Sequence, residues 1–237
     1  MMKSSRLTPT FLILALAALN PEVTQATIGV TNLGNTVPTG FHTGNTVLDP
    51  HTSLAGLPEV FGFRSGNIHN QTFTVSGYGI ELKKILIGYG TLTGAATAAT
   101  ITLTVDAGNN GSNEISEQFT LTPASITQQA AAPYAGIHWL ELDVTSSALV
   151  LSPGVHAFRL TVNSITGASN TWLLAPSYSA DVNQYTGGIM SGAGNPLSAA
   201  IRDANFAIFG TFPDSDSDNL PDPWELSIPG VVSLDDL

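Results

Sequence analysis

Apolar and polar residues alternate along most of the chain after its first 26 residues. In residues 101–105, Ile101, Leu103 and Val105 fall on one side of an extended backbone, and the two threonines between them fall on the other. This alternation predicts strands with one buried face. Similar runs bounded by turn residues predict eight strands, at residues 27–31, 71–75, 80–89, 98–106, 137–144, 155–162, 171–174 and 205–211.

One predicted strand places aromatic and acidic side chains on its outer face. In residues 139–144, the two leucines and Val144 point inward. The other three side chains, Trp139, Glu141 and Asp143, therefore share the outer face. A tryptophan beside acids suits sugar stacking, and some β-sandwich glycosidases present paired carboxylates in this way. Soluble sandwiches commonly have such residues on outer faces, so we expect no catalytic residue here and no enzyme.

The segments between the predicted strands are rich in Gly, Asn and Pro, which form turns. Residues 34–70 are irregular, and we expect a covering loop there with one or two short strands, because structureless loops of that length are unusual in compact domains. The only helix expected is a short one near residues 223–227. The pattern predicts one all-β domain at residues 27–212, a two-sheet β-sandwich.

Residues 1–26 have the pattern of a cleaved signal peptide. Lys3 and Arg6 precede an apolar run at residues 11–19, which is too short to span a bilayer. Small residues at the two positions that a signal peptidase reads predict cleavage after Ala26. No later apolar stretch is long enough to be a membrane anchor. The expected location is therefore secreted or at the cell surface.

Charge and cysteine content exclude several classes of function. The formal net charge is -11, and removal of the leader leaves a chain close to -12. Such a chain repels phosphate backbones, so nucleic acid is not an expected partner. The absence of cysteine excludes disulfides, thiolate metal sites, a cysteine nucleophile and a lipid-modified cysteine. The five histidines are scattered without the spacing of metal ligands.

The strongest chemical signal is the acidic segment 214–225. Its carboxylates fall at loop positions one, three, five, nine and twelve, which suits a Ca²⁺ ion that takes six to eight oxygen ligands. Mg²⁺ fits less well because its octahedral shell resists so many protein ligands. The alternative is an acidic linker that binds calcium weakly or not at all. The predicted ligands are Asp214, Asp216, Asp218, the carbonyl of Leu220, Asp222 and Glu225.

This segment resembles the calcium loops of EF-hand, dockerin and thrombospondin type 3 repeats. It is most similar to the Asp-rich, Pro-Asp-x-Trp-Glu segments of exported bacterial proteins. Asn219 stands where those families usually have Gly, and Asn also tolerates the left-handed backbone conformation. A complete EF-hand would need a helix on each side, whereas residues 205–212 have the pattern of a strand.

The preceding part of the chain resembles the bacterial exported jelly-roll modules, of the choice-of-anchor kind, that are found upstream of varied surface anchors. The resemblance extends over about residues 65–212 and implies a jelly-roll β-sandwich. It says little about the ligand, because such sandwiches host many functions. The motifs concerned lie, in order, at residues 71–75, 80–88, 139–144, 151–160, 172, 185–188 and 203–211.

The leading hypothesis is a non-enzymatic surface module, structural or adhesive, with a calcium-stiffened spacer at residues 213–237. That spacer is expected to lead to further sequence in a longer protein, and a cell-surface partner is expected. The alternatives are a carbohydrate-binding module and a polysaccharide hydrolase. The candidate glycan contacts are Trp139, Trp172 and Tyr185. A weaker second calcium set, of residues that more often form turns, is Asp106, Asn109, Asn110 and Asp203.

Overall fold

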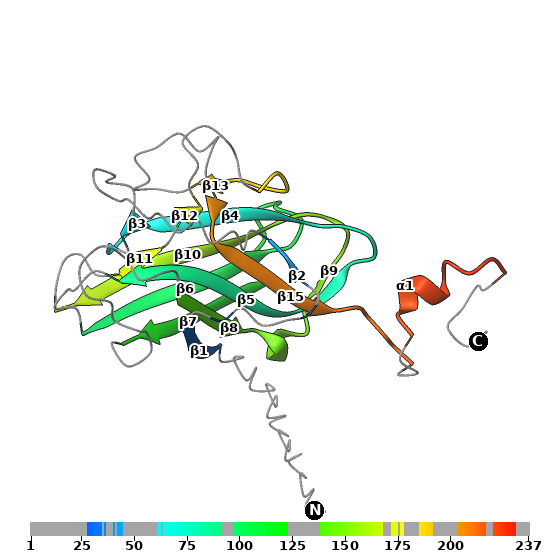
Figure 1. Ribbon diagram of the computed structural model, residues 1–237, viewed down its shortest axis with the longest axis horizontal. Helices are drawn as coiled ribbons and strands as arrows, with labels where there is room; N and C mark the ends of the chain where they lie inside the picture. The colour runs from blue at the N-terminus through cyan, green and yellow to red at the C-terminus, as the bar shows by residue number, and fades with distance from the viewer. Residues whose placement is uncertain are drawn as a thin grey trace, which may run out of the picture.

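The structure, a computed structural model, consists mainly of antiparallel strands (Figure 1). The helical elements within the described residues are a 3-10 turn, η1 (Thr145–Ser147), and a single α-helical turn, α1 (Asp222–Glu225). No helix in this part of the chain is long and apolar enough to cross a membrane. The described residues are 28–34, 36, 40, 42–44, 61–62, 64–91, 97–122, 138–167, 172–174, 176–177, 185–191, 203–216 and 220–230.

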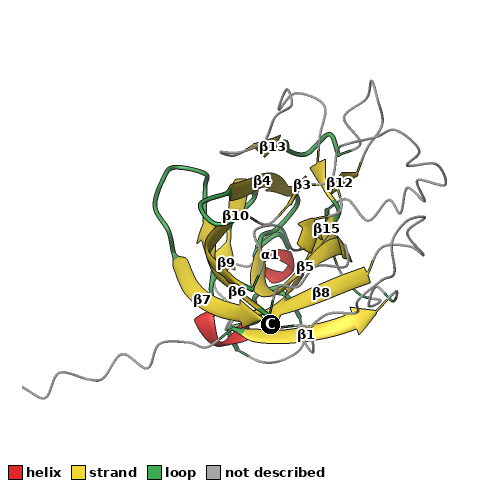
Figure 2. Cartoon of the chain, turned by 90° about the vertical axis from the view of Figure 1, so that its left-hand side faces the viewer, coloured by secondary structure: helices red, strands yellow, loops and turns green. Residues whose placement is uncertain are grey.

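Two sheets face each other, as the end view in Figure 2 shows. The first sheet contains β1 (Gly29–Gly34), β2 (His42–Thr43), β3 (Phe61–Gly62), β5 (Ile80–Thr91), β8 (His138–Asp143), β9 (Val150–Leu151), β11 (Trp172–Leu174) and β15 (Phe206–Thr211). In this sheet β5 is central, because it pairs with β8 along one side and with β15 along the other. Beyond these neighbours, β1 pairs with β8 and β2 pairs with β15.

The second sheet has the order β13–β4–β10–β6–β7. Its strands are β4 (Ile68–Val75), β6 (Ala98–Asp106), β7 (Ile115–Leu121), β10 (Gly154–Thr166) and β13 (Met190–Ser191). The long strand β10 is hydrogen-bonded to β4 on one side and to β6 on the other. A separate two-stranded ladder joins β12 (Pro176–Ser177) to β14 (Asp203–Ala204).

The order of eight strands identifies the fold as a jelly roll. The eight strands concerned, in chain order, are β2, β4, β5, β6, β7, β8, β10 and β15. In the first sheet the neighbouring strands follow the order β2–β15–β5–β8, which are the first, eighth, third and sixth of these. In the second sheet the order is β4–β10–β6–β7, which are the second, seventh, fourth and fifth. Every connection between them crosses from one sheet to the other, except the β6–β7 hairpin. Two facing sheets connected in this way form a jelly roll. The predicted all-β, two-sheet jelly-roll β-sandwich is therefore confirmed, and β1 is an additional strand beside β8.

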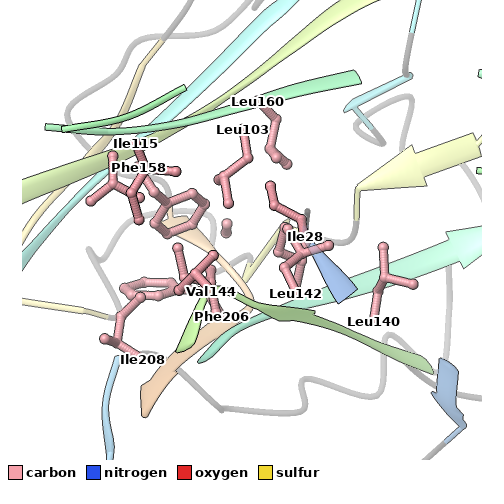
Figure 3. Packing of buried hydrophobic residues seen from close by; sticks show 14 of the residues in the cluster. Ile28, Leu103, Ile115, Leu140, Leu142, Val144, Phe158, Leu160, Phe206 and Ile208 are labelled. Carbon is pink, nitrogen blue, oxygen red and sulfur yellow. The ribbon is translucent and has the colours of Figure 1, made fainter. Parts of the chain in front are cut away.

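Large apolar side chains from both sheets fill the space between them (Figure 3). Phe73 and Phe158 of the second sheet meet Phe206 of the first, with ring centroids 5.5 to 6.5 Å apart. In β6, Leu103 is fully buried and the alternation seen in the sequence is reproduced. Each side chain of this size stabilises the fold by about 1.5–3 kcal/mol relative to an exposed position.

All eight predicted strands are present, with ends that differ from the prediction, and β7 is a strand that the sequence pattern misses. In β7 the inward positions include Ile115, Phe119 and Leu121, which are buried. Glu117 occupies the remaining inward position and interrupts the alternation. The irregular region of residues 34–70 contains the short strands β2 and β3, as expected, and α1 lies at the predicted short helix.

Candidate functional site

The predicted calcium loop follows β15, and Asp222 closes it. The amide nitrogen of Asp222 donates to the carbonyl oxygen of Pro213 at 2.9 Å. The carboxylate of Asp222 accepts hydrogen bonds from the amide of Ser215, at 2.5 Å, and from its hydroxyl, at 2.6 Å. The hydroxyl bond and then the amide bond hold the pKa of Asp222 below its ordinary value. The chain thus returns on itself between Pro213 and Asp222, as a cation loop requires.

Helix α1 forms the last four residues of this predicted loop. The carbonyl of Pro221 accepts hydrogen bonds from the amides of Trp224 and Glu225, at 2.8 and 3.1 Å. Glu225 is fully buried, although Trp224 beside it is 44% exposed. Figure 1 shows α1 beyond the end of the sandwich. A carboxylate removed from water needs hydrogen bonds or a cation in compensation.

The other predicted calcium ligands lie along the same loop. Asp214 is half-buried, whereas Asp216 and the side chain of Leu220 are exposed. Asp218 lies outside the described residues. Across the described ranges, no three acidic, histidine or cysteine side chains form a group that could hold a metal ion. The structure therefore closes the loop at Asp222 without gathering the described carboxylates into a cluster.

The outer face of the first sheet has an apolar cluster of its own. Leu86, Trp139, Ala207 and Phe209 pack there, and none of them is more than 8% exposed. The strand register places them on the side opposite to the main core. Trp139 has no exposed surface, so the prediction that its indole is available to a sugar is wrong. The alternating pattern identifies the correct face of the strand, but it does not show that this face is covered.

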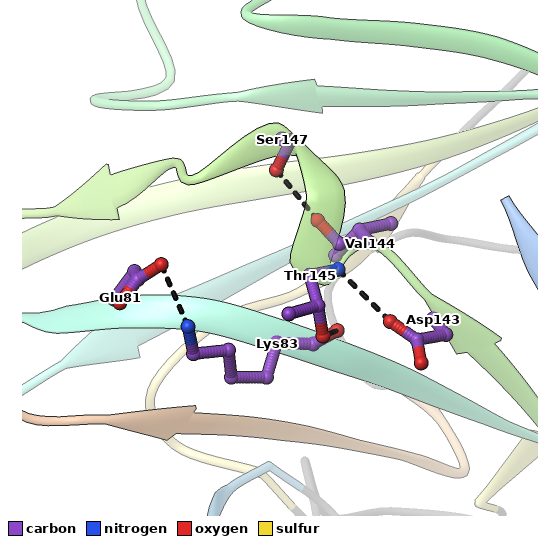
Figure 4. Close-up of polar contacts among 6 residues, drawn as sticks. All are labelled: Glu81, Lys83, Asp143, Val144, Thr145 and Ser147. Atoms are coloured by element: carbon purple, nitrogen blue, oxygen red, sulfur yellow. Dashed lines mark hydrogen bonds and ion pairs between the residues drawn. The ribbon is translucent and has the colours of Figure 1, made fainter. Parts of the chain in front are cut away.

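Each of the two acids on this strand has a structural partner. Glu141 Oε2 lies 2.9 Å from Lys84 Nζ on the neighbouring strand β5. Asp143 Oδ1 accepts a hydrogen bond from the amide of Thr145 at 2.9 Å, where η1 begins (Figure 4). This bond, more than the nearby Lys84 and Lys83, holds the pKa of Asp143 below its ordinary value. Both carboxylates thus stabilise β8 and the turn that follows it.

Tyr185 is an anchor for a turn. Its ring lies edge-on to Phe206, with centroids 5.2 Å apart, and its hydroxyl oxygen accepts a hydrogen bond from the amide of Thr74 at 3.0 Å. Trp172, the remaining candidate for glycan contact, pairs through its backbone with Thr91 of β5. Its side chain lies outside the described residues.

Side-chain hydrogen bonds hold the turn that follows Tyr185 against one side of β4. The hydroxyl of Thr74 donates to the carbonyl of Gly187 at 2.6 Å, and the hydroxyl of Thr72 accepts from the amide of Ile189 at 2.8 Å. A Cβ atom on Gly188 would lie 1.8 Å from the carbonyl oxygen of Thr72, so only glycine fits. The turn covers backbone groups of β4 beyond the two residues that pair with β13, where they would otherwise be free to pair.

A buried polar pair near this turn was not identified from the sequence. Asp203 has no exposed surface, and Gln71 is 1% exposed. The carboxylate of Asp203 accepts from Gln71 Nε2 at 2.9 Å and from the amide of Tyr185 at 3.0 Å. Gln71 Oε1 accepts from the amide of Ala204 at 2.8 Å. Burial raises the pKa of Asp203, and the two hydrogen bonds oppose that rise.

The residues considered for a second calcium site form separate local structures. Asp106 accepts hydrogen bonds from the amides of Asn110 and Gly111, at 2.9 and 2.8 Å, so it shapes the turn after β6. Asp203 is bonded to Gln71 instead. The structure thus agrees with the turn-forming interpretation of Asp106.

Comparison with known proteins assigns no family to the chain. No protein-family model matches it, and no curated protein matches its sequence. Function is therefore inferred from the jelly-roll fold and from the chemistry of its residues.

Proposed function

We propose that the chain is an exported, non-enzymatic structural or adhesive module, in which a jelly-roll domain is followed by a calcium-binding spacer. The observation that supports it best is the burial of Glu225 at the twelfth position of a loop that Asp222 closes onto Ser215. An acid with no exposed surface beside a set of alternating aspartates suits a divalent cation better than it suits a solvated linker.

Calcium would be held by oxygens from one winding of the backbone. Asp214, Asp216 and Asp218 would supply carboxylate oxygens, Leu220 its carbonyl, and Glu225 both oxygens of its side chain. Asp222 fits the ninth position, which often acts through a water molecule, and its bonds to Ser215 already orient it. The bound ion would neutralise acids that repel one another, and would thereby stiffen the segment that leaves β15.

The environments of Trp139 and Tyr185, two of the three predicted glycan contacts, favour a structural or adhesive role over sugar stacking. Trp139 is fully buried in the cluster on the outer sheet face, and Tyr185 holds a turn against β4. Export is supported by the leader at residues 1–26. N-terminal sequencing of the secreted chain should give Thr27 as its first residue.

Isothermal titration of the purified chain tests the calcium proposal directly. We expect a single site with a dissociation constant of about 0.1–1 mM, the range of extracellular calcium modules. Replacement of Asp216 and Asp218 by Asn should abolish the heat. The control is Asp235→Asn with Asp236→Asn, which removes the same charge outside the loop and should leave binding intact. Absence of heat from the unmodified chain at millimolar calcium would reject the proposal.

A further inference from the structure

The turn between β6 and β7 contains the one Asn–Gly pair of the sequence, Asn110–Gly111. The side-chain amide of an asparagine can be attacked by the backbone nitrogen of the next residue, and a glycine there leaves the attack unhindered because it has no Cβ. Both residues are exposed. Gly111 has a φ of 92°, and a Cβ atom added to it would meet nothing within 4 Å. The peptide bond between them is therefore open to water.

The side chain of Asn110 folds back toward the backbone that follows it. Its Oδ1 accepts a hydrogen bond from the amide of Ser112 at 2.8 Å. This bond closes a small ring that includes both the Cγ atom of Asn110 and the backbone nitrogen of Gly111. Nδ2 of Asn110 donates to the carbonyl of Ala107 at 3.2 Å, which fixes the other end of the amide. The electrophilic carbon and the nitrogen are thus held close together before reaction, which lowers the entropic cost of attack.

A carboxylate contacts the N–H group of the attacking nitrogen. Asp106 Oδ2 accepts a hydrogen bond from the amide of Gly111 at 2.8 Å, and Asp106 Oδ1 accepts one from the amide of Asn110 at 2.9 Å. Asp106 itself is only 4% exposed. A backbone amide is a poor nucleophile while it keeps its proton, so a carboxylate that already binds this proton is placed as a general base. Asp106 therefore shapes the turn and also touches the group that must lose a proton.

Ser112 lies where negative charge would develop in the reaction. When the nitrogen of Gly111 adds to Cγ, Oδ1 of Asn110 becomes an oxyanion, and an N–H donor already aimed at it stabilises that charge. The amide of Ser112 is this donor. The hydroxyl of Ser112 lies 2.6 Å from Asn110 Oδ1 and 2.5 Å from Glu114 Oε1. Glu114 also accepts a hydrogen bond from the amide of Ala107 at 2.7 Å, which ties the two ends of the turn together.

We propose that the folded turn, with Asp106 as the base, promotes conversion of Asn110 to aspartate and isoaspartate through a cyclic imide with Gly111. The nitrogen of Gly111 forms a bond to Cγ of Asn110, and its proton passes to Asp106, which returns it to solvent. The bond from Cγ to Nδ2 then breaks, and Nδ2 takes up one proton from water and leaves as ammonia. Water finally hydrolyses the imide. Attack of water at Cγ gives aspartate, whereas attack at the backbone carbonyl leaves the chain connected through the side chain, as isoaspartate.

The reaction changes the turn irreversibly. The product adds a carboxylate to a turn that already contains Asp106 and Glu114, and the hydrogen bond from Nδ2 of Asn110 to Ala107 is lost. Isoaspartate also lengthens the backbone by one carbon inside the β6–β7 hairpin. The modified turn therefore holds these two strands together less tightly, and the extent of modification records the age of the molecule.

Mass spectrometry of peptides from the purified chain, incubated at neutral pH, provides the test. The peptide that contains Asn110 should gain the mass that accompanies exchange of an amide for a carboxyl group, in two products that chromatography separates. A synthetic peptide of residues 103–116 gives the rate of the same Asn–Gly pair without the fold. The folded chain should react at least about tenfold faster than this peptide, since a positioned general base typically contributes about 10²–10⁴-fold. The chain unfolded in urea should react at the rate of the peptide.

Two substitutions and one internal control assign the effect to Asp106. Asp106→Asn should reduce the rate of the folded chain to that of the peptide. Glu114→Gln removes a carboxylate from the same turn without touching the reacting atoms, so it should keep most of the acceleration. Asn163, which is followed by serine and whose Nδ2 donates to Thr102 Oγ1 at 2.7 Å, should keep its amide in the same samples.

The comparison of folded chain and peptide decides the matter even if a variant fails to fold. A folded chain that reacts no faster than the peptide would overturn the proposal, because the hydrogen bonds of the turn would then protect Asn110. An Asp106→Asn chain that keeps the full rate, or an equal loss of rate in Asp106→Asn and Glu114→Gln, would count against Asp106 as the base. None of these outcomes depends on the proposed calcium site.

Discussion

Gln71 and Asp203 are 132 positions apart in the sequence, and a hydrogen bond of 2.9 Å joins their side chains in the protein interior. The second oxygen of Asp203 accepts from the amide of Tyr185 at 3.0 Å. The pair therefore connects β4 of the second sheet to the segment that enters β15 of the first, and to the turn that covers the edge of β4. Its disruption affects three parts of the fold at once.

Replacement of Asp203 by Asn should lower the free energy of unfolding by about 1–3 kcal/mol, the cost of a buried polar group without a partner. The aspartate presents two acceptor oxygens to two N–H donors. In the asparagine, one acceptor becomes an NH₂ group that faces a donor. Denaturant unfolding measures the change. The exposed Asp216, changed in the same way, should have an effect within about 0.5 kcal/mol.

The contribution of Asp203 should also depend on pH. Burial raises the pKa of its carboxyl above the ordinary 3.8, so the folded protein holds this proton more tightly than the unfolded chain. The stabilisation is complete below pH 3.8 and is lost as the pH rises through the pKa of the folded state. The difference in unfolding free energy between the unmodified protein and Asp203→Asn should therefore be larger in acid than at neutral pH. A constant difference from pH 3 to 7 would contradict the buried position of this carboxyl.

Gly188→Ala should detach the turn that covers β4, because the added Cβ would lie 1.8 Å from the carbonyl oxygen of Thr72. We expect a loss of stability of about 3 kcal/mol, at the upper end for overpacking. Thermal unfolding measures it. Gly66→Ala is the control, since Gly66 has a φ of 85° and open space around its Cβ position. That variant reports backbone strain alone, about 1 kcal/mol.

Trp139→Ala should destabilise the protein by about 3–5 kcal/mol, as expected for a large buried aromatic residue. The same change at Trp224, which is 44% exposed, should cost less than about 0.5 kcal/mol in calcium-free buffer. Equal effects of the two substitutions in chemical unfolding would contradict the second apolar cluster.

Local alternation in the sequence is sufficient to predict most of the strands. It places Leu103 in the core and Trp139 on the opposite face of its sheet, because successive side chains of a strand must point to opposite sides. It fails for β7, where Glu117 occupies an inward position. It also fails to show that Trp139 is buried. A two-residue alternation indicates to which side of the sheet a side chain points, but it does not show which other residues cover that side.

Contacts between distant segments could not be predicted in this way. Nothing in the sequence around Gln71 indicates that its amide meets Asp203, because that contact depends on how β4 and β14 are brought together. The predicted calcium loop is the opposite case. Its signal is local, at residues 214–225, and the structure adds two features that spacing does not reveal, namely the bonds from Ser215 to Asp222 and the burial of Glu225.

The position of β15 determines how the module would respond to mechanical tension. The strand lies between β2 and β5, and the chain continues from it directly into the loop and α1. Because the hydrogen bonds of an antiparallel ladder are perpendicular to the strands, a pull on α1 along β15 strains many of these bonds together in shear. A pull across the strand would instead open them one after another. If residues 213–237 act as the proposed spacer, a pull directed along β15 would meet the more resistant, shearing arrangement of these bonds.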